Sequence, residues 1–320
     1  MKIGVSFGHG LAPSEVLAGA KVAEESGFAS VWVSESTGFD SLSILGAIAS
    51  QTRKMELGSG IVNIYSRSAT QLAMASASID ELSRGRFTLG VGASSESVIS
   101  EWHRLEYAAQ LSRMKDAVQE IKEKLRGPRG SSLHFRNETF VPIVIAAVHN
   151  KMVLLAKEIA DGVLFFLRPL SRLREDTRSI AKENFSVHAS VVCCVSSDTR
   201  IAEERVRRTV AFYLAHGEHY RRFIQAHTSL LEGTSSTIRD LWLKGKREEA
   251  ARLVPREILD EVAIFGTPSE CNRKIEQDYY TIDSLSTLAL QFNPGENSTL
   301  ESFKNLRLIA QEFDTSGKRK

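Results

Sequence analysis

One segment of the sequence, Leu57–Ser94, constrains the fold more than any other. Two apolar runs typical of buried strands flank an amphipathic helix, and the runs end in Gly58-Ser59-Gly60 and Gly90-Val91-Gly92. A strand, a helix and a strand in this order are typical of a parallel α/β unit. Glycine at the end of a strand usually marks a close approach of another group to the backbone. Because ligands of parallel α/β proteins bind at the carboxyl ends of the strands, the segment also indicates the functional face.

The same alternation continues along most of the chain. Strands are predicted over residues 2–7, 29–33, 55–61, 87–91, 141–146, 162–167, 187–195 and 284–291. Helices are predicted over residues 14–26, 42–52, 70–83, 111–125, 151–160, 171–183, 267–279 and 299–312, with Ser14 capping the first. Eight strands with interleaved helices predict a (β/α)₈ barrel, a TIM barrel, as a single domain over residues 1–320. An open doubly wound sheet is the alternative.

A mostly helical insertion is expected at residues 198–261, after the seventh strand and on the carboxyl-end side of the barrel. Its three histidines, His216, His219 and His227, have no cysteine or carboxylate at a spacing that would complete a metal site, so no metal is predicted. The Gly127-Pro128-Arg129-Gly130 stretch is expected to break the helix that precedes it.

Composition narrows the class of protein. The chain has 320 residues and a net charge of +2, which gives no support for a nucleic-acid partner. No apolar run reaches the roughly 18 residues that cross a bilayer, and a strand pattern begins directly after Met1, so neither a membrane segment nor a signal peptide is predicted. Cys193, Cys194 and Cys271 are expected to be small core residues in a reducing, cytoplasmic environment.

Five segments of the chain, in order, match one known family. With them the chain resembles the bacterial luciferase-like superfamily, and most of all the branch that uses the deazaflavin coenzyme F420, typified by the methylenetetrahydromethanopterin reductase of archaea. The element Asp80-Glu81-Leu82-Ser83, followed by Gly85-Arg86, is the most specific of the matches. The segments are Lys2-Ile3-Gly4-Val5, Val31-Trp32-Val33-Ser34-Glu35, Leu57–Ser94, Ala156–Gly162 and Phe265-Gly266-Thr267-Pro268-Ser269-Glu270.

The resemblance implies where a flavin-like ring would bind. In the family the ring lies across the carboxyl ends of the barrel strands, on a bulge with a non-prolyl cis peptide, which corresponds here to Gly60–Ile61. Asn63 could bond an edge of the ring, whereas Tyr65 and Arg67 are expected to anchor the loop. The loop of small residues Gly92, Ala93 and Ser94 would flank the cofactor side chain. The expected cofactor is coenzyme F420, with FMN as the alternative.

A second cofactor contact is expected after the fifth predicted strand. There the residues Ala146, Ala147, Val148 and His149 lead into a helix whose amino end could bind a phosphate. The family usually has glycines in this loop, and their replacement predicts weaker phosphate binding. His149 either offers a charge to the phosphate or is an ordinary polar loop residue.

Three serines stand where the reductases carry functional side chains. Ser6 and Ser95 replace acidic residues, and Glu35-Ser36 replaces an aspartate-histidine pair. The remaining candidates for proton transfer are Glu35 and His9, each with a structural role as the alternative. Two missing carboxylates predict poor reduction of methylenetetrahydromethanopterin.

Together these observations predict a cytoplasmic oxidoreductase that transfers a hydride between coenzyme F420 and a small organic substrate of unspecified identity. An FMN-dependent monooxygenase of the same superfamily is one alternative, and a barrel that binds a flavin-like ligand without chemistry is the other. A homodimer is expected, because family members commonly associate through helices beside the early strands. The small residues Ala73, Ala75 and Ala77 suit such packing, or packing on the barrel itself.

Overall fold

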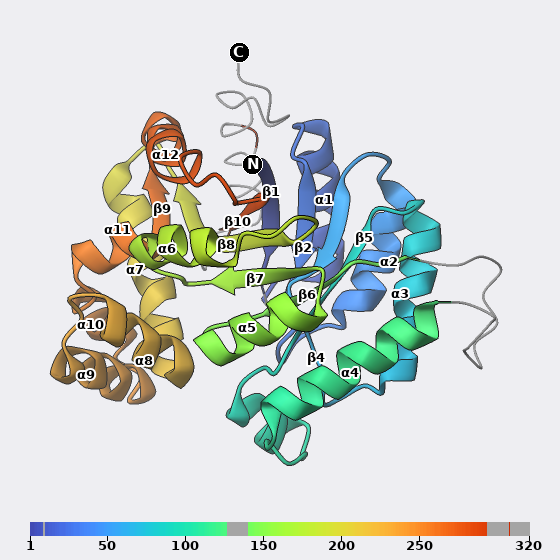
Figure 1. Cartoon of the computed structure of the whole chain (residues 1–320). Coiled ribbons are helices and arrows are strands. Elements are labelled where there is room, and N and C mark those ends of the chain that lie inside the picture. The colour runs from blue at the N-terminus through green and yellow to red at the C-terminus, as the bar shows by residue number, and fades with distance from the viewer. Residues whose placement is uncertain (9, 127–139, 293–306, 308–320) are drawn as a thin grey trace.

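The computed structural model describes residues 1–8, 10–126, 140–292 and 307. Eight parallel strands form a closed barrel (Figure 1). The strand β10 closes it, because it pairs with β1 on one side and with β8 on the other, so that Gln291 lies opposite both Ser6 and Val192. This closure confirms the (β/α)₈ barrel and rules out the open sheet. The barrel strands are β1 (Lys2–Phe7), β2 (Ser30–Val33), β3 (Glu56–Ser59), β5 (Phe87–Gly92), β6 (Ile143–Ala146), β7 (Gly162–Phe166), β8 (Ser186–Val195) and β10 (Thr287–Phe292).

Helices surround the barrel and bury its outer wall. The main core lies between strands and helices and includes Leu45, Leu72, Leu89 and Ile145, all buried. The helices are α1 (Pro13–Glu25), α2 (Ser41–Gln51), α3 (Ala69–Ser83), α4 (Gln110–Leu125), α5 (Asn150–Ile159), α6 (Leu170–Ile180) and α12 (Pro268–Lys274), which continues as a π-helix over Ile275–Tyr279. The predicted helix over residues 299–312, apart from residue 307, and the Gly127-Pro128-Arg129-Gly130 break lie outside the described residues.

Local capping explains where several helices begin. Ser68 caps α3 together with the Gln71 side chain, and Thr267 caps α12 together with Glu270, as the Thr-Pro-Ser-Glu sequence indicates. The prediction that Ser14 caps α1 is wrong. Helix α1 begins at Pro13, and the Glu15 carboxylate satisfies the Ala12 N–H at 2.7 Å, so the serine lies inside the first turn.

Two short strands were not predicted. The strand β4 (Val62–Asn63) follows β3 after the Gly60–Ile61 peptide bond, which is cis, and it pairs with the end of β5. The predicted strand over residues 55–61 is therefore too long: β3 ends at Ser59, and β4 lies beyond the predicted range. The strand β9 (Ala263–Gly266) pairs with the final residues of β8, outside the closed barrel.

The insertion forms a helical unit after β8 (Figure 1). Its helices pack around a second apolar cluster that includes Val206, Ile224 and Ile238. The Tyr213 hydroxyl contacts Gln291 at the carboxyl end of β10, so the insertion lies on the carboxyl-end side of the barrel, as predicted. The helices are α7 (Thr199–His216), α8 (Glu218–His227), α9 (Glu232–Leu243), α10 (Arg247–Arg252) and α11 (Arg256–Val262).

The interior of the barrel is filled with side chains. Trp32, Val144, Leu164 and Ala289 form a small buried cluster there. The Trp32 ring lies 5.0 Å from the ring of His188. All three cysteines are buried and none forms a disulfide bond, as expected of core residues. No helix among the described residues is long and apolar enough to cross a membrane.

Candidate active site at the carboxyl end of the barrel

The turn between β3 and β4 presents the Ile61 side chain at the carboxyl end of the barrel. The backbone N–H of Gly60 donates to the carbonyl of Val33 at 2.9 Å, which ties the turn to the end of β2. Ile61 is half-buried and packs on the interior cluster that contains Trp32 and Leu164. The cis Gly60–Ile61 bond implied by the family resemblance is present. This turn is the apolar surface that a planar ring would contact.

The glycines at the end of β5 make room for this turn. A Cβ on Gly90 would lie 1.9 Å from the carbonyl oxygen of Ser59, and a Cβ on Gly92 would lie 2.7 Å from Cδ1 of Ile61. The close approach expected at these glycines is therefore made by the protein's own chain. Gly90 and Gly92, which indicated a ligand-binding edge in the sequence, are needed because the Gly60–Ile61 bulge packs against β5.

Asn63 stabilises the loop that follows the bulge. Its Oδ1 accepts hydrogen bonds from the backbone N–H of Tyr65 at 3.0 Å and of Ser66 at 2.8 Å. The Tyr65 hydroxyl donates to the carbonyl of Ala108 at 3.1 Å, which confirms its expected anchoring role. Because the amide oxygen of Asn63 is engaged, only its amide nitrogen could bond the edge of a ring.

The loop after β5 brings small residues to the same edge. Ala93 and Ser94 are half-buried, and Ser94 adopts a left-handed backbone conformation with φ +60°. The Tyr107 hydroxyl donates to the carbonyl of Ser94 at 3.2 Å and fixes the turn. Ser95, where the resemblance implies an acid, lies with its hydroxyl 3.2 Å from that of Ser97.

Glu35 belongs to an ion-pair network. Arg67 donates to both of its carboxylate oxygens, at 2.6 and 2.8 Å, and the backbone N–H and hydroxyl of Ser41 add bonds at 3.1 and 3.2 Å. Arg67 also pairs with Asp40, the cap of α2. The hydrogen bonds to Glu35 raise the pKa of Arg67. The structure thus gives Glu35 a positioning role. The other candidate for proton transfer, His9, lies outside the described residues.

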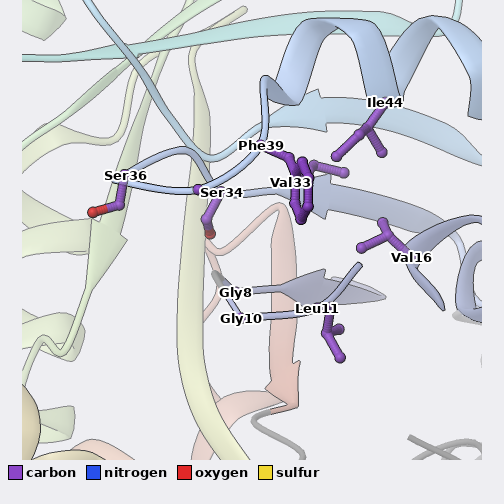
Figure 2. Close-up of a pocket in the computed structure, with 10 residues that line it drawn as sticks. Gly8, Gly10, Leu11, Val16, Val33, Ser34, Ser36, Phe39 and Ile44 are labelled. Atoms are coloured by element: carbon purple, nitrogen blue, oxygen red, sulfur yellow. The ribbon is translucent and has the colours of Figure 1, made fainter. Parts of the chain in front are cut away.

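A small pocket opens between the loops that follow β1 and β2 (Figure 2). Figure 2 shows apolar side chains, including Val16 and Val33, gathered on one side, whereas Ser34 and Ser36 lie on the other. Glu35 stands between these serines in sequence but does not line the pocket. The described residues that line it are uncharged: Gly8, Gly10, Leu11, Val16, Val33, Ser34, Ser36, Gly38, Phe39 and Ile44.

The loop after β6 leads to the amino end of α5. Ala147 is buried, and its N–H donates to the carbonyl of Leu164 at 3.1 Å, whereas the carbonyl of Val148 accepts a bond from Arg168. Ala146 is half-buried and close to Gly92. His149 occupies the cap position of α5 and is exposed. The loop without glycines therefore still places a helix amino end beside the loop after β5.

Positive groups gather around His149. Burial lowers the pKa of His149, and the nearby Arg168, His227 and Arg222 lower it further. The Phe223 ring of α8 lies between the histidines, with its centroid 6.0 Å from that of His149 and 4.2 Å from that of His227. Arg168 and Arg222 are each paired with a carboxylate, that of Asp176 and that of Glu218 respectively. The feature of this loop that could bind a phosphate is therefore the amino end of α5 with the His149 side chain beside it.

Several residues at this end of the barrel were not identified from the sequence. Gln291 could have been recognised in the sequence, because it is a polar residue inside the apolar run of β10. Arg168 lies two residues after the end of the apolar β7, whereas Tyr213, in the insertion, has no distinguishing pattern. No group of three or more His, Cys, Asp or Glu side chains within the described ranges could hold a metal ion.

Comparison with known proteins identifies the family. The model of the luciferase-like monooxygenase family matches residues 1–283. The 5,10-methylenetetrahydromethanopterin reductase of Archaeoglobus fulgidus is 29% identical, over 87% of this chain and 90% of the relative. A putative coenzyme F420-dependent oxidoreductase of Mycobacterium tuberculosis is 25% identical, over 83% and 88%. The structure of the coenzyme F420-dependent tetrahydromethanopterin reductase from Methanopyrus kandleri superimposes with a TM-score of 0.82 at 20% identity, covering 99% of each chain. The chain belongs to the luciferase-like monooxygenase family.

Proposed function

We propose that this protein is an oxidoreductase that transfers a hydride between coenzyme F420 and a small organic substrate. The observation that carries the proposal is the loop from Ala146 to His149 at the amino end of α5, which lies next to Gly92 and so close to the apolar turn at Ile61. A cofactor that joins a planar ring to a phosphate needs both features next to each other. Two relatives that share most of the chain's length are named as an F420-dependent oxidoreductase and a methylenetetrahydromethanopterin reductase, which supports F420 over FMN.

Different residues of this chain would bind the ring, the side chain and the phosphate of such a cofactor. Gly60 and Ile61 would support one face of the ring, and the Asn63 amide nitrogen would contact its edge. Gly92, Ala93 and Ser94 would flank the side chain, and Ala146, Ala147, Val148 and His149 would hold the phosphate. The bound coenzyme supplies the hydride chemistry. The protein contributes position, and positioning provides a large part of the rate of such a reaction.

The test is anaerobic turnover of the reduced coenzyme with alcohols, aldehydes, ketones and methylenetetrahydromethanopterin. We expect oxidation of the coenzyme with at least one small substrate, and little with the pterin, since Ser6 and Ser95 replace the expected acids. Oxygen-dependent turnover with reduced FMN alone would instead support a monooxygenase. Tight coenzyme binding without turnover of any substrate would support a binding protein.

We also propose a homodimer, with the outer face of α3 as the contact. Ala73 and Ala77 are buried against the barrel, so these small residues do not form the contact surface. Met74 and Leu82 are 48% and 54% exposed on the same helix. Sedimentation equilibrium of the wild type and of Met74→Lys tests this proposal, which predicts that the charge shifts the dimer toward monomer.

A further inference from the structure

Within the function proposed above, we infer that Tyr213 and Gln291 form the site that binds the substrate oxygen, and that this site takes neutral carbonyl compounds or the corresponding alcohols. The two residues come from different parts of the fold. Gln291 lies near the end of β10, and Tyr213 lies on α7 of the insertion. The Gln291 Nε2 group donates to the Tyr213 hydroxyl oxygen at 2.9 Å.

Gln291 places its hydrogen-bonded pair with Tyr213 at the carboxyl end of the barrel. Gln291 is 4% exposed, and its register partner on β1 is Ser6. A Cβ on Gly8 would lie 3.1 Å from Nε2 of Gln291, so the amide reaches over the end of β1, next to Gly8, which lines the pocket. Gln291 thus places a polar amide at this end of the barrel. It lies opposite Ser6, which occupies a position where the family resemblance implies an acid.

Aromatic packing fixes the Tyr213 hydroxyl. The Tyr213 ring meets those of Phe166 and Phe212 edge-on, at centroid distances of 4.8 and 5.2 Å, and Tyr220 lies 6.2 Å away. Burial raises the pKa of Tyr213 to about 12, so the hydroxyl keeps its proton at neutral pH. Gln291 donates to the phenolic oxygen, and the phenolic proton is therefore available to a second acceptor. A substrate oxygen is such an acceptor.

The location and the chemistry of the pair agree. Along the barrel wall, β1 and β2 separate β10 from β3, which carries the Ile61 turn. The Ile61 turn and the Tyr213–Gln291 pair both lie at the carboxyl end of the barrel, where a bound ring and its substrate would meet. Both groups are neutral, so a carboxylate or phosphate bound at this pair would lose its hydration without gaining a counter-charge from either side chain. A ketone, aldehyde or alcohol needs only the hydrogen bonds that a hydroxyl and an amide supply.

The experiment uses a neutral probe and a charged one. We would measure binding of isobutyramide and isobutyrate to the full-length protein by ligand-observed NMR, with and without coenzyme F420. The variants are Tyr213→Phe and Gln291→Met, and Tyr220→Phe is the control, because this neighbouring tyrosine is also packed against Phe166. Coenzyme affinity and the urea-unfolding midpoint are measured for each variant.

We expect the wild type to bind isobutyramide and to reject isobutyrate. Tyr213→Phe should weaken the binding of isobutyramide at least tenfold, which is about 1.4 kcal/mol. Its affinity for the coenzyme should stay unchanged, and Tyr220→Phe should bind isobutyramide like the wild type. The inference is overturned if the wild type does not bind the amide, if it prefers the carboxylate, or if Tyr213→Phe lowers only the unfolding midpoint. Probe binding without a response to coenzyme F420 would instead contradict the proposed function and retain the oxygen site.

Discussion

The guanidinium of Arg67 holds both carboxylate oxygens of Glu35, at 2.6 and 2.8 Å. The pair joins the loop after β2 to the loop after β4, the two segments that flank the Gly60–Ile61 turn. Only 11% of the Glu35 side chain and 20% of the Arg67 side chain are exposed, so solvent screens the pair weakly. A carboxylate held in this way orients loops rather than transfers protons.

The first prediction concerns Glu35→Gln. Loss of the two-bonded ion pair should lower the free energy of unfolding by about 1–3 kcal/mol, because the remaining Arg67 loses charge-assisted hydrogen bonds. The measurement is urea unfolding. Glu56→Gln is the control, since its ion pair with Lys2 is about half exposed, and we expect less than about 0.5 kcal/mol there. A Glu35 variant that is fully stable but inactive would restore the proton-transfer role.

The second prediction concerns the buried pair of Arg168 and Asp176. Asp176 accepts from Nε of Arg168 at 2.7 Å and from Arg172 at 2.8 Å, and Arg168 also binds the carbonyl of Val148. Asp176→Asn leaves a buried guanidinium without its counter-charge, which should cost about 3–5 kcal/mol of stability. Coenzyme affinity should fall as well, because Arg168 holds the loop that contains Val148.

The matched control for this pair is Glu175→Gln on the same helix. Glu175 is 67% exposed where it pairs with Arg172, and its loss should change the unfolding free energy by less than about 0.5 kcal/mol. Equal losses of unfolding free energy in Asp176→Asn and Glu175→Gln would show that the buried ion pair stabilises the protein no more than the exposed one.

The third prediction separates two glycines of β5. Gly90→Ala places a methyl group against the backbone oxygen of Ser59 and should destabilise the protein by about 3 kcal/mol or more. Gly92→Ala meets only the end of the Ile61 side chain, which can move. We therefore expect nearly normal stability but roughly tenfold weaker coenzyme binding, equal to about 1.4 kcal/mol. Unchanged coenzyme affinity in Gly92→Ala would remove Ile61 from the proposed ring site.

The fourth prediction concerns pH. Burial lowers the pKa of His188 to about 4, so the folded protein keeps this histidine neutral while the unfolded chain binds a proton below about pH 6.5. Stability should therefore fall as pH decreases from 6.5 toward 4, by up to about 3 kcal/mol from this residue. His188→Gln should flatten that slope, and the exposed His103→Gln should not. His219, with its pKa also lowered to about 4, contributes a similar slope that both variants retain.

The sequence predicts the barrel well because its strands are fully buried. Continuous apolar runs such as Val187–Val195 stand out between amphipathic helices, and their ends fall within a few residues of those observed. Strand β4 was missed because it is only two residues long, and β9 because it follows helix α11 directly, with no turn between them. Helix starts also depend on side-chain bonds, as with Glu15 at the start of α1.

The site was harder to predict than the fold, because its groups are assembled from distant segments. Glu35 meets an arginine 32 residues away, and Gln291 meets a tyrosine 78 residues away. Residue type alone made Glu35 a candidate acid, whereas its role depends on that arginine. The His149 loop was located from its place before a helix, but the basic side chains near it, those of Arg168, Arg222 and His227, come from the segment after β7 and from the insertion.

The most direct test of the proposed cofactor is equilibrium titration of the purified protein with coenzyme F420 and with FMN, in parallel. We expect tighter binding of coenzyme F420, and weaker binding of it in His149→Ala, because that substitution removes an imidazole that could hydrogen-bond a phosphate at the amino end of α5. Tight binding of FMN with no response to coenzyme F420 would show that the proposed cofactor is wrong.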